Sequence, residues 1–433
     1  MRAASSYQRT LAVLAFFTLA AGDFWRYLLG WWGWGAIAGL LLVLVAVELV
    51  RQRVDLRRLP FWLLAFLGFA ALSIAWSAYR PETAVAVLAT LATTCLAVFV
   101  ATCLTWEEAL ETLSDALRWV LGLSLVFELA VATIIRRPVL PLWVDYSDLE
   151  TIPRAFYWSR NLLLEGGRIQ GIVGNANILG MLSLIAIIVF VLRLVARKGS
   201  PVWGWTWLAA AVATFGLTRS STVIVAAVAV ALVTVFLAIV RRTTGRARVV
   251  VFASGVALAI AAGVVAFLAR GPLLALLGRS SDLTNRLDIW QTVGELALER
   301  PVAGWGWISY WAPWVEPFRD LVVIKGVTYL QAHNAWLDVF LQLGAIGVAI
   351  FAIFVFGALV RSWGMAAELT RIRYAPAELR WPENAAPLLL LVALLVQSLA
   401  ESRLLIELGF ALLVIIAIKT GWRDPERADA VES

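Results

Sequence analysis

Long apolar stretches alternate with short polar segments along the whole chain. Each stretch approaches the roughly 20 residues that a helix needs to cross the hydrocarbon core of a bilayer. Within lipid, backbone polar groups are satisfied only in helices or closed barrels, and apolar runs of this length favour helices. We therefore predict twelve membrane-spanning helices, at residues 9–24, 28–50, 59–76, 84–104, 118–135, 171–193, 201–217, 221–240, 249–268, 332–360, 384–400 and 403–420.

The composition agrees with lipid as the main solvent. Of 433 residues, 62% are hydrophobic and 15% are charged, whereas a soluble domain has about 25% charged residues. The fold class expected is all-α, a polytopic transmembrane bundle that forms a single membrane domain over residues 1–433. The first apolar run, 9–24, ends in small residues, so a cleaved signal peptide is an alternative for that segment.

Lysine and arginine are concentrated in every second loop. With the N-terminus placed in the cytoplasm, the cytoplasmic loops contain 21 of these residues and the short loops on the other side contain four. Because basic residues are enriched in cytoplasmic loops, we predict a protein of the cytoplasmic (inner) membrane with both termini in the cytoplasm. These loops also account for the formal net charge of +7, and we expect no binding to nucleic acid.

Two predicted outer loops are long, at residues 136–170 and 269–331, and long loops often carry function. Between Asp282 and Arg300 of the second loop, apolar residues recur every three or four positions until an Arg-Pro pair ends the pattern. This spacing predicts an amphipathic helix that lies on the outer membrane surface. Its apolar positions are Leu283, Leu287, Trp290, Val293, Leu296 and Ala297.

Four tryptophans follow this helix, at Trp305, Trp307, Trp311 and Trp314. Tryptophan is enriched at membrane interfaces whatever a protein does, so an interfacial belt is the first interpretation. Stacking against sugars is the alternative.

The chain has one histidine, His333, where the second long loop meets the tenth predicted span. An imidazole titrates near neutrality and therefore suits general base catalysis. The positive end of the helix dipole disfavours a charged ring, so we expect a neutral base. A capping or interfacial histidine is the alternative.

Several arginines lie on the same outer side. Arg219 occupies a tight turn between two spans, Arg286 lies on the amphipathic helix, and Arg168 and Arg279 are further candidates. A guanidinium group binds phosphate through two parallel hydrogen bonds and keeps its charge at any relevant pH. Such groups would therefore stabilise a departing pyrophosphate. Snorkelling to lipid headgroups is the alternative for Arg219, and a surface ion pair is the alternative for Arg286.

Acidic residues offer no obvious metal site. Asp145 and Asp148 are the nearest approach to an acidic cluster outside, and zinc-binding spacing is absent, so we expect no cofactor and a metal-independent reaction. Cys95 and Cys103 are too far apart along one helix for a disulfide. Glu401, at the outer rim, is expected to orient His333 or a substrate, or to contact Arg403. An acidic residue within a span, Glu128, is costly and therefore notable.

Several motifs, taken in order, resemble the O-antigen ligase and exopolysaccharide polymerase superfamily, whose members are polytopic GT-C-like glycosyltransferases. The resemblance covers about residues 160–350 together with the pattern of spans. Its motifs are Arg168-Ile169-Gln170-Gly171, Gly174-Asn175-Ala176-Asn177 with Gly180, Thr218-Arg219-Ser220-Ser221, Thr284 to Trp290, Pro301 to Gly306, and His333-Asn334 with Gly344 and Gly347.

The resemblance implies transfer of a glycan from a polyprenyl pyrophosphate carrier, with inversion and without a metal, outside the cytoplasmic membrane. By motif, Arg219 and Arg286 would hold the pyrophosphate and His333 would be the base. The stretch from Thr284 to Trp290 is most similar to the polymerase branch. Further candidate substrate-binding residues are Arg168, Arg279, Asn177, Trp290, Trp305 and Glu401.

The partners expected are the polyprenyl-pyrophosphate-linked oligosaccharide donor, a glycan or lipid acceptor, membrane lipids and other polysaccharide export proteins. A ligase that transfers the glycan to a lipid or another acceptor is the alternative within the enzyme class. Outside it, a polysaccharide transporter or lipid-linked glycan flippase would place charge at mid-membrane. A non-catalytic scaffold would tolerate alanine at His333 and Arg219.

Overall fold

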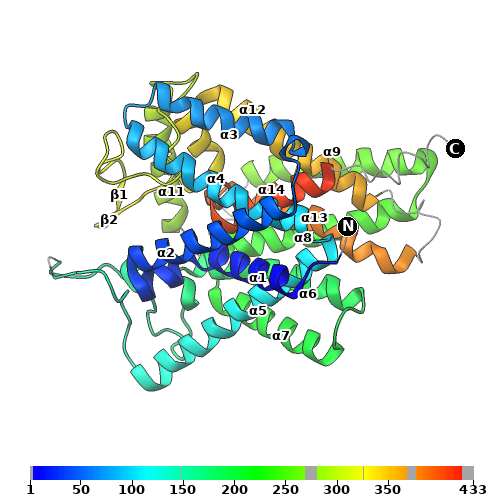
Figure 1. Ribbon diagram of the computed structural model, residues 1–433, viewed down its shortest axis with the longest axis horizontal. Coiled ribbons are helices and arrows are strands. Elements are labelled where there is room, and N and C mark those ends of the chain that lie inside the picture. Colours follow the sequence, from blue (N-terminus) through cyan, green and yellow to red (C-terminus); the bar gives the residue numbers. More distant parts are fainter. Residues whose placement is uncertain (1–2, 148, 269–279, 325, 368–376, 422–433) are drawn as a thin grey trace.

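The computed structural model describes residues 3–147, 149–268, 280–324, 326–367 and 377–421, which form a bundle of long helices (Figure 1). The main helices are α1 (Ser6–Ala20), α2 (Gly22–Arg51), α3 (Phe61–Leu72), α4 (Arg80–Cys103), α5 (Trp106–Ala130), α6 (Ala176–Val195), α7 (Pro201–Thr218), α8 (Ser221–Arg242), α9 (Gly245–Leu268), α11 (Ser280–Leu298), α12 (Ala335–Ala367), α13 (Ala377–Ser398) and α14 (Glu407–Gly421).

Short elements complete the described chain. The 3-10 turns are η1 (Leu56–Arg58), η2 (Ser73–Ala75), η4 (Arg154–Phe156), η5 (Gly171–Val173) and η7 (Arg403–Leu405), and η3 (Val131–Ile135) is a π-helical turn after α5. Strands β1 (Val323–Ile324) and β2 (Val327–Thr328) pair antiparallel, with Val323 opposite Thr328.

Each of the twelve predicted spans has a helix at its position, namely α1 to α9 and α12 to α14. Six of the described helices, α2, α4, α5, α6, α8 and α12, are long and apolar enough to cross a membrane by length and composition. The all-α polytopic membrane fold is therefore confirmed, whereas twelve crossings remain a prediction. Cys95 and Cys103 are both free.

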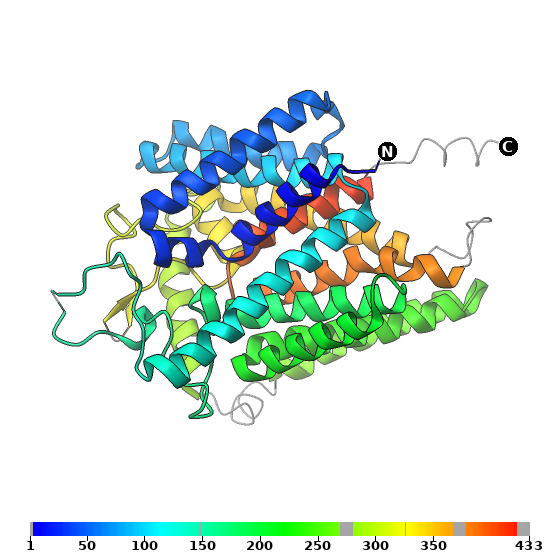
Figure 2. The same cartoon turned by 60° about the horizontal axis from the view of Figure 1, so that its bottom comes forward.

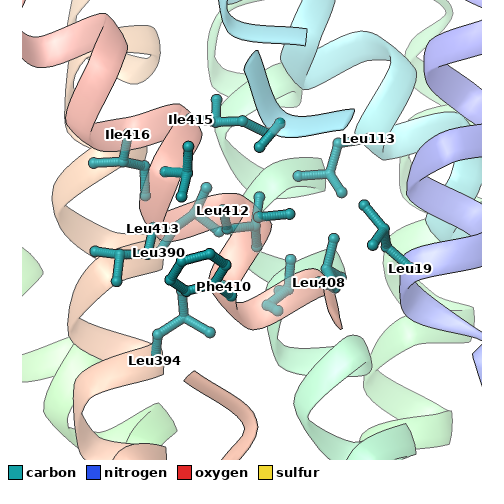
Figure 3. Close-up of a cluster of buried hydrophobic side chains, with 14 of the residues drawn as sticks. Leu19, Leu113, Leu390, Leu394, Leu408, Phe410, Leu412, Leu413, Ile415 and Ile416 are labelled. Atoms are coloured by element: carbon teal, nitrogen blue, oxygen red, sulfur yellow. The ribbon is translucent and has the colours of Figure 1, made fainter. Parts of the chain in front are cut away.

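The core of the bundle is built around α14, which packs against α1, α4, α12 and α13. Every residue from Leu408 to Ile418 is buried, so this helix is apolar on all sides, as expected of a helix enclosed by others. Figure 3 shows Leu390 and Leu394 of α13 beside Phe410 of α14.

Helix α5 begins twelve residues before the predicted span. Thr105 and Glu108 form a capping box, in which the Thr105 hydroxyl accepts from the Glu108 amide and the Glu108 carboxylate accepts from the Thr105 amide. The first turns of α5 mix polar and apolar residues and bury one side. A search for uniformly apolar runs misses such a segment.

The two ends of the bundle differ. Arg9 of α1 pairs with Glu108 at 2.9 Å, and Lys419 of α14 donates to the Leu104 carbonyl at 2.6 Å, so α1 starts and α14 finishes beside the α4–α5 turn. The long loops and the hairpin lie at the other end (Figures 1 and 2), which we call the loop end.

The predicted amphipathic helix is present as α11, and part of its predicted apolar face is buried. Val293, Leu296 and Ala297 of the predicted face are buried together with Ile289, whereas Leu287 is 53% exposed. These side chains form a second hydrophobic core with Trp311, Phe318 and Leu341. Helix α11 thus packs against α12 and the folded loop through protein contacts. Its position on the outer membrane surface remains a prediction.

The belt interpretation is also wrong for two tryptophans. Trp307 and Trp311 are fully buried. The Trp307 indole donates to the Thr90 hydroxyl at 3.0 Å, and the Trp311 indole donates to the Asp338 carboxylate at 3.0 Å. They anchor the loop to α4 and α12. Trp314 is 65% exposed.

Helix α12 is interrupted at Gly344, and the loop after α11 fills the break. Hydrogen bonds run from Trp305 N to Leu341 O, Gly306 N to Gln342 O, Ala345 N to Pro301 O and Ile346 N to Val302 O, at 2.8–3.2 Å. Gly304 and Gly344 both have positive φ, and a Cβ on either would come within 2.4 Å of the other segment's backbone. This explains the glycines in both motifs.

Candidate functional site

Glu401 is the centre of a polar network at the loop end. It follows α13 and is only 6% exposed. One carboxylate oxygen accepts from His333 Nδ1 at 2.8 Å, and the other accepts from Arg286 Nη2 and Asn177 Nδ2, both at 2.9 Å. Three predicted site residues from three distant segments therefore meet on one carboxylate.

The network extends through Asn177 to the first long loop. Asn175 caps α6 by accepting from the amides of Asn177 and Ile178, which places Asn177 in the first turn. The Asn177 side-chain oxygen accepts from Arg168 Nη2 at 2.6 Å and from the Ser220 hydroxyl at 2.9 Å. We call His333, Glu401, Arg286, Asn177 and Arg168 the Glu401 network.

His333 lies just before α12 rather than in its first turn. Asn334 caps the helix, and His333 has a left-handed backbone with φ of 50°. Such a conformation is unfavourable for a residue other than glycine and persists where neighbours fix it. The ring is held by Glu401 and by an edge contact with Tyr329, whose centroid is 5.5 Å away.

Glu401 is ionised at neutral pH. Burial alone would raise the pKa of its carboxyl, but the hydrogen bond and charge of His333, together with Arg286 and Arg403, lower that pKa to about 2. An ionised carboxylate only accepts hydrogen bonds, so His333 Nδ1 carries the proton. In a neutral ring, Nε2 is then free to accept a proton.

The two arginines singled out for pyrophosphate lie at the same end. The Arg286 side chain is 15% exposed, and besides Glu401 it donates a longer bond of 3.4 Å to the Thr222 hydroxyl. Arg219 caps α7 with φ of 48° and an exposed side chain. The residues on either side of it are tied to the network, since Arg168 donates to the Thr218 carbonyl at 3.1 Å and Ser220 donates to Asn177.

The remaining candidates are placed differently. The Trp290 indole donates to the Ala332 carbonyl at 3.0 Å, directly beside His333. The Trp305 indole donates to Leu296 O at 3.0 Å, and its ring is covered by the Arg300 guanidinium at 4.0 Å, so its contacts hold the loop on α11. Arg279 lies outside the described residues.

Glu128 holds the first long loop. Its carboxylate accepts from the Ser159 hydroxyl at 2.9 Å and from the amides of Gln170 and Gly171 at 2.8 Å. Buried charge that is costly in isolation is thus satisfied by backbone donors next to Arg168. This contact fixes the start of the loop segment that enters the network.

Two polar residues beside the network were not predicted. Asp338 is fully buried and accepts from the Ala332 amide at 3.1 Å and from the Ser402 hydroxyl. An ionisable residue inside an otherwise apolar span was the available signal. Ser402 offered none beyond its place next to Glu401.

Two cavities in the described part of the chain lie apart from the residues of this network. A cavity of about 230 Å³ lies between α3, α12 and α14, away from the loop end, and one of about 40 Å³ lies between α1, α6, α13 and α14. Neither is lined by residues of the Glu401 network. Over the part of the chain that the structure describes, no group of three His, Cys, Asp or Glu is suited to a metal ion.

The fold and this network define a polytopic membrane protein with a charged, hydrogen-bonded site at one end of its bundle. Residues 205–352, from α7 into α12, match the family model described as O-antigen ligase. This stretch includes Arg219, Arg286 and His333, and its similarity to O-antigen ligase agrees with the resemblance predicted from the motifs. This supports an enzyme of the ligase or polymerase type. A comparison with curated proteins gave no match.

Proposed function

We propose that the protein is a glycosyltransferase that moves a glycan from a polyprenyl pyrophosphate carrier to a hydroxyl of an acceptor glycan, at the outer face of the cytoplasmic membrane. The observation that carries the proposal is the sharing of Glu401 by His333 and Arg286. A base and a fixed cation bound to the two oxygens of one carboxylate lie within reach of one substrate.

In the reaction proposed, the acceptor oxygen attacks the anomeric carbon of the donor sugar and inverts it. The new carbon–oxygen bond forms as the bond from that carbon to the phosphate oxygen breaks, and the electron pair leaves with polyprenyl pyrophosphate. The acceptor proton passes to His333 Nε2. Glu401 holds the ring through Nδ1 and balances the charge that develops on it.

Arginines would stabilise the departing pyrophosphate. Arg286 has five N–H donors in a planar fork, and its contacts with Glu401 and Thr222 engage its two terminal nitrogens. The guanidinium thus has further N–H groups for phosphate oxygens, with Arg219 from the adjacent α7–α8 turn as its partner. Cations that are already positioned where negative charge develops in the transition state lower the activation free energy, because they need not move during the reaction.

The two candidate functions, polymerase and ligase, differ in the acceptor that receives the glycan. The stretch from Thr284 to Trp290 supports a polymerase, in which the acceptor is another lipid-linked glycan. The family match described as O-antigen ligase supports transfer to a lipid or another non-polymeric acceptor. Both use the same donor and the same catalytic residues.

A reconstituted assay tests the proposal. Purified protein in liposomes receives a polyprenyl-pyrophosphate oligosaccharide, and released polyprenyl pyrophosphate and elongated glycan are measured. We expect His333→Ala to fold normally and to lose transfer by a factor of about 100 to 10,000. Near-normal transfer by this variant would exclude His333 as the catalytic base, and movement of the lipid without release of pyrophosphate would indicate a flippase.

The same assay distinguishes the two acceptors. Elongation with the donor alone favours the polymerase, whereas a requirement for a lipid A core acceptor favours the ligase.

A further inference from the structure

Asp338 binds a residue adjacent in sequence to His333 and a residue adjacent in sequence to Glu401. It lies in the first turns of α12 and is 0% exposed. Its Oδ1 accepts from the Trp311 indole at 3.0 Å. Its Oδ2 accepts from the Ala332 amide at 3.1 Å and from the Ser402 hydroxyl.

The two donors on Oδ2 come from the two segments that carry the pair. Ala332 immediately precedes His333, and Ser402 immediately follows Glu401. Nothing in local secondary structure fixes the distance between these segments, because His333 lies before the start of α12 and Glu401 follows the last residue of α13. Asp338 Oδ2 thus links the segment that carries His333 to the segment that carries Glu401.

We propose that Asp338 is a positioning residue of the transfer reaction. By holding Ala332 and Ser402 on one oxygen, it fixes the 2.8 Å contact between His333 Nδ1 and Glu401 Oε2 and so directs Nε2 at the acceptor hydroxyl. It also supports the left-handed backbone of His333. This inference rests on the proposed function, since it assigns Asp338 a part in that reaction.

Gln342 provides a matched control. It lies one turn further along the same side of α12 and is also fully buried. Its side-chain oxygen accepts from the amides of Ile308 and Ser309 at 2.9 and 2.8 Å. It therefore anchors the same outer loop as Asp338, but its contacts do not adjoin His333 or Glu401.

The test compares Asp338→Asn, Ser402→Ala and Gln342→Met in the reconstituted assay, with thermal stability measured for each. An asparagine has the same shape but one acceptor oxygen, so its NH2 group faces either the Ala332 amide and the Ser402 hydroxyl or the Trp311 indole, which then lose their acceptor. We expect Asp338→Asn to lower kcat by about ten- to a hundredfold with the KM for the donor within twofold, because a small misplacement of a catalytic group is enough. Ser402→Ala should lower kcat by a smaller factor, and Gln342→Met should change stability but leave kcat within twofold.

A kinetic cycle separates positioning from general destabilisation. In a Glu401→Gln background the charge that orients His333 is already absent, so adding Asp338→Asn should lower kcat by less than threefold. A full additional loss there, or a loss of kcat in Gln342→Met equal to that in Asp338→Asn, would overturn the inference. If Asp338→Asn does not fold, an unchanged kcat in Ser402→Ala overturns it instead.

The outcome for His333→Ala keeps the two proposals apart. Transfer that survives His333→Ala contradicts the proposed function itself. Transfer that disappears in His333→Ala but persists at full kcat in both Asp338→Asn and Ser402→Ala contradicts only the role of Asp338.

Discussion

Two charged clusters lie next to each other at the loop end, and they differ in composition. One is the Glu401 network. The second, which we call the quartet, joins the first turns of α2 to η7 and the start of α14 and consists of Asp23, Arg26, Arg403 and Glu407. In the quartet each arginine contacts both carboxylates, so two positive and two negative charges are matched.

In the Glu401 network, by contrast, one carboxylate accepts from a histidine, an arginine and an amide. A balanced set of ion pairs holds helices together. It attracts an anion only weakly, because its positive charges are already matched by carboxylates. A single carboxylate that serves several donors instead orients them and leaves part of their hydrogen-bonding capacity for a ligand. The comparison teaches that the number of charged residues at a membrane rim does not distinguish a binding site from a structural cluster. The way in which those charges are paired does.

The largest effect that distinguishes the clusters is expected from their glutamates. Glu401→Gln removes the charge that orients His333, and we expect kcat for glycan transfer to fall by about 100-fold or more. Glu407→Gln breaks the quartet and should lower the melting temperature while leaving kcat within about threefold. Equal losses of kcat in the two variants would abolish the distinction between a catalytic network and a structural one.

A smaller effect is expected from conservative replacement of Arg286, the arginine that binds Glu401 directly. Arg286→Lys keeps the charge but loses the planar fork, so transfer should fall by about tenfold or more. Arg319 is a matched control, because it lies on the same outer loop in an exposed pair with Glu316 at 3.6 Å. Arg319→Lys should transfer at the rate of the unmodified protein, and a rate for Arg286→Lys within twofold of that rate would argue against a bidentate contact.

The smallest effect concerns acid stability. The pKa of Glu401 is lowered to about 2 in the folded protein, so its charge stabilises the fold above its ordinary pKa of about 4.5, and this contribution is lost as the pH falls towards 2. The melting temperature of the unmodified protein should exceed that of Glu401→Gln at pH 5. The margin should then narrow down to pH 3. A margin that stays constant to pH 3 would be inconsistent with an ionised, bound Glu401.

Much of the fold follows from local sequence, because a membrane span is recognised by length and apolarity alone. The twelve predicted spans coincide with helices for this reason. The same criterion misses the polar first turns of α5. It also cannot show that Trp307 and Trp311 are enclosed, since their burial depends on a loop that folds back onto α4 and α12.

Several residues of the candidate site were predicted, and a contact of Glu401 with His333 was one of the predicted alternatives, but the contacts of Glu401 with Arg286 and Asn177 were not predicted. His333, Arg286 and Asn177 are suggested by residue type and motif, yet Glu401 lies 68, 115 and 224 residues away from them. No local spacing encodes such contacts. The same holds for Asp338 and Ser402, whose importance appears only once α12 and the α13–α14 turn lie side by side.

The most direct test of the account measures binding of the leaving group itself. Undecaprenyl pyrophosphate is titrated into nanodiscs that contain the unmodified protein, Arg286→Lys or Arg26→Lys, the last of which alters the quartet and keeps its charge. We predict an affinity reduced by about tenfold or more for Arg286→Lys, as expected on loss of a bidentate phosphate contact. Arg26→Lys should bind as tightly as the unmodified protein. Unchanged binding in Arg286→Lys, or a larger loss in Arg26→Lys, would contradict the assignment of the pyrophosphate to the Glu401 network.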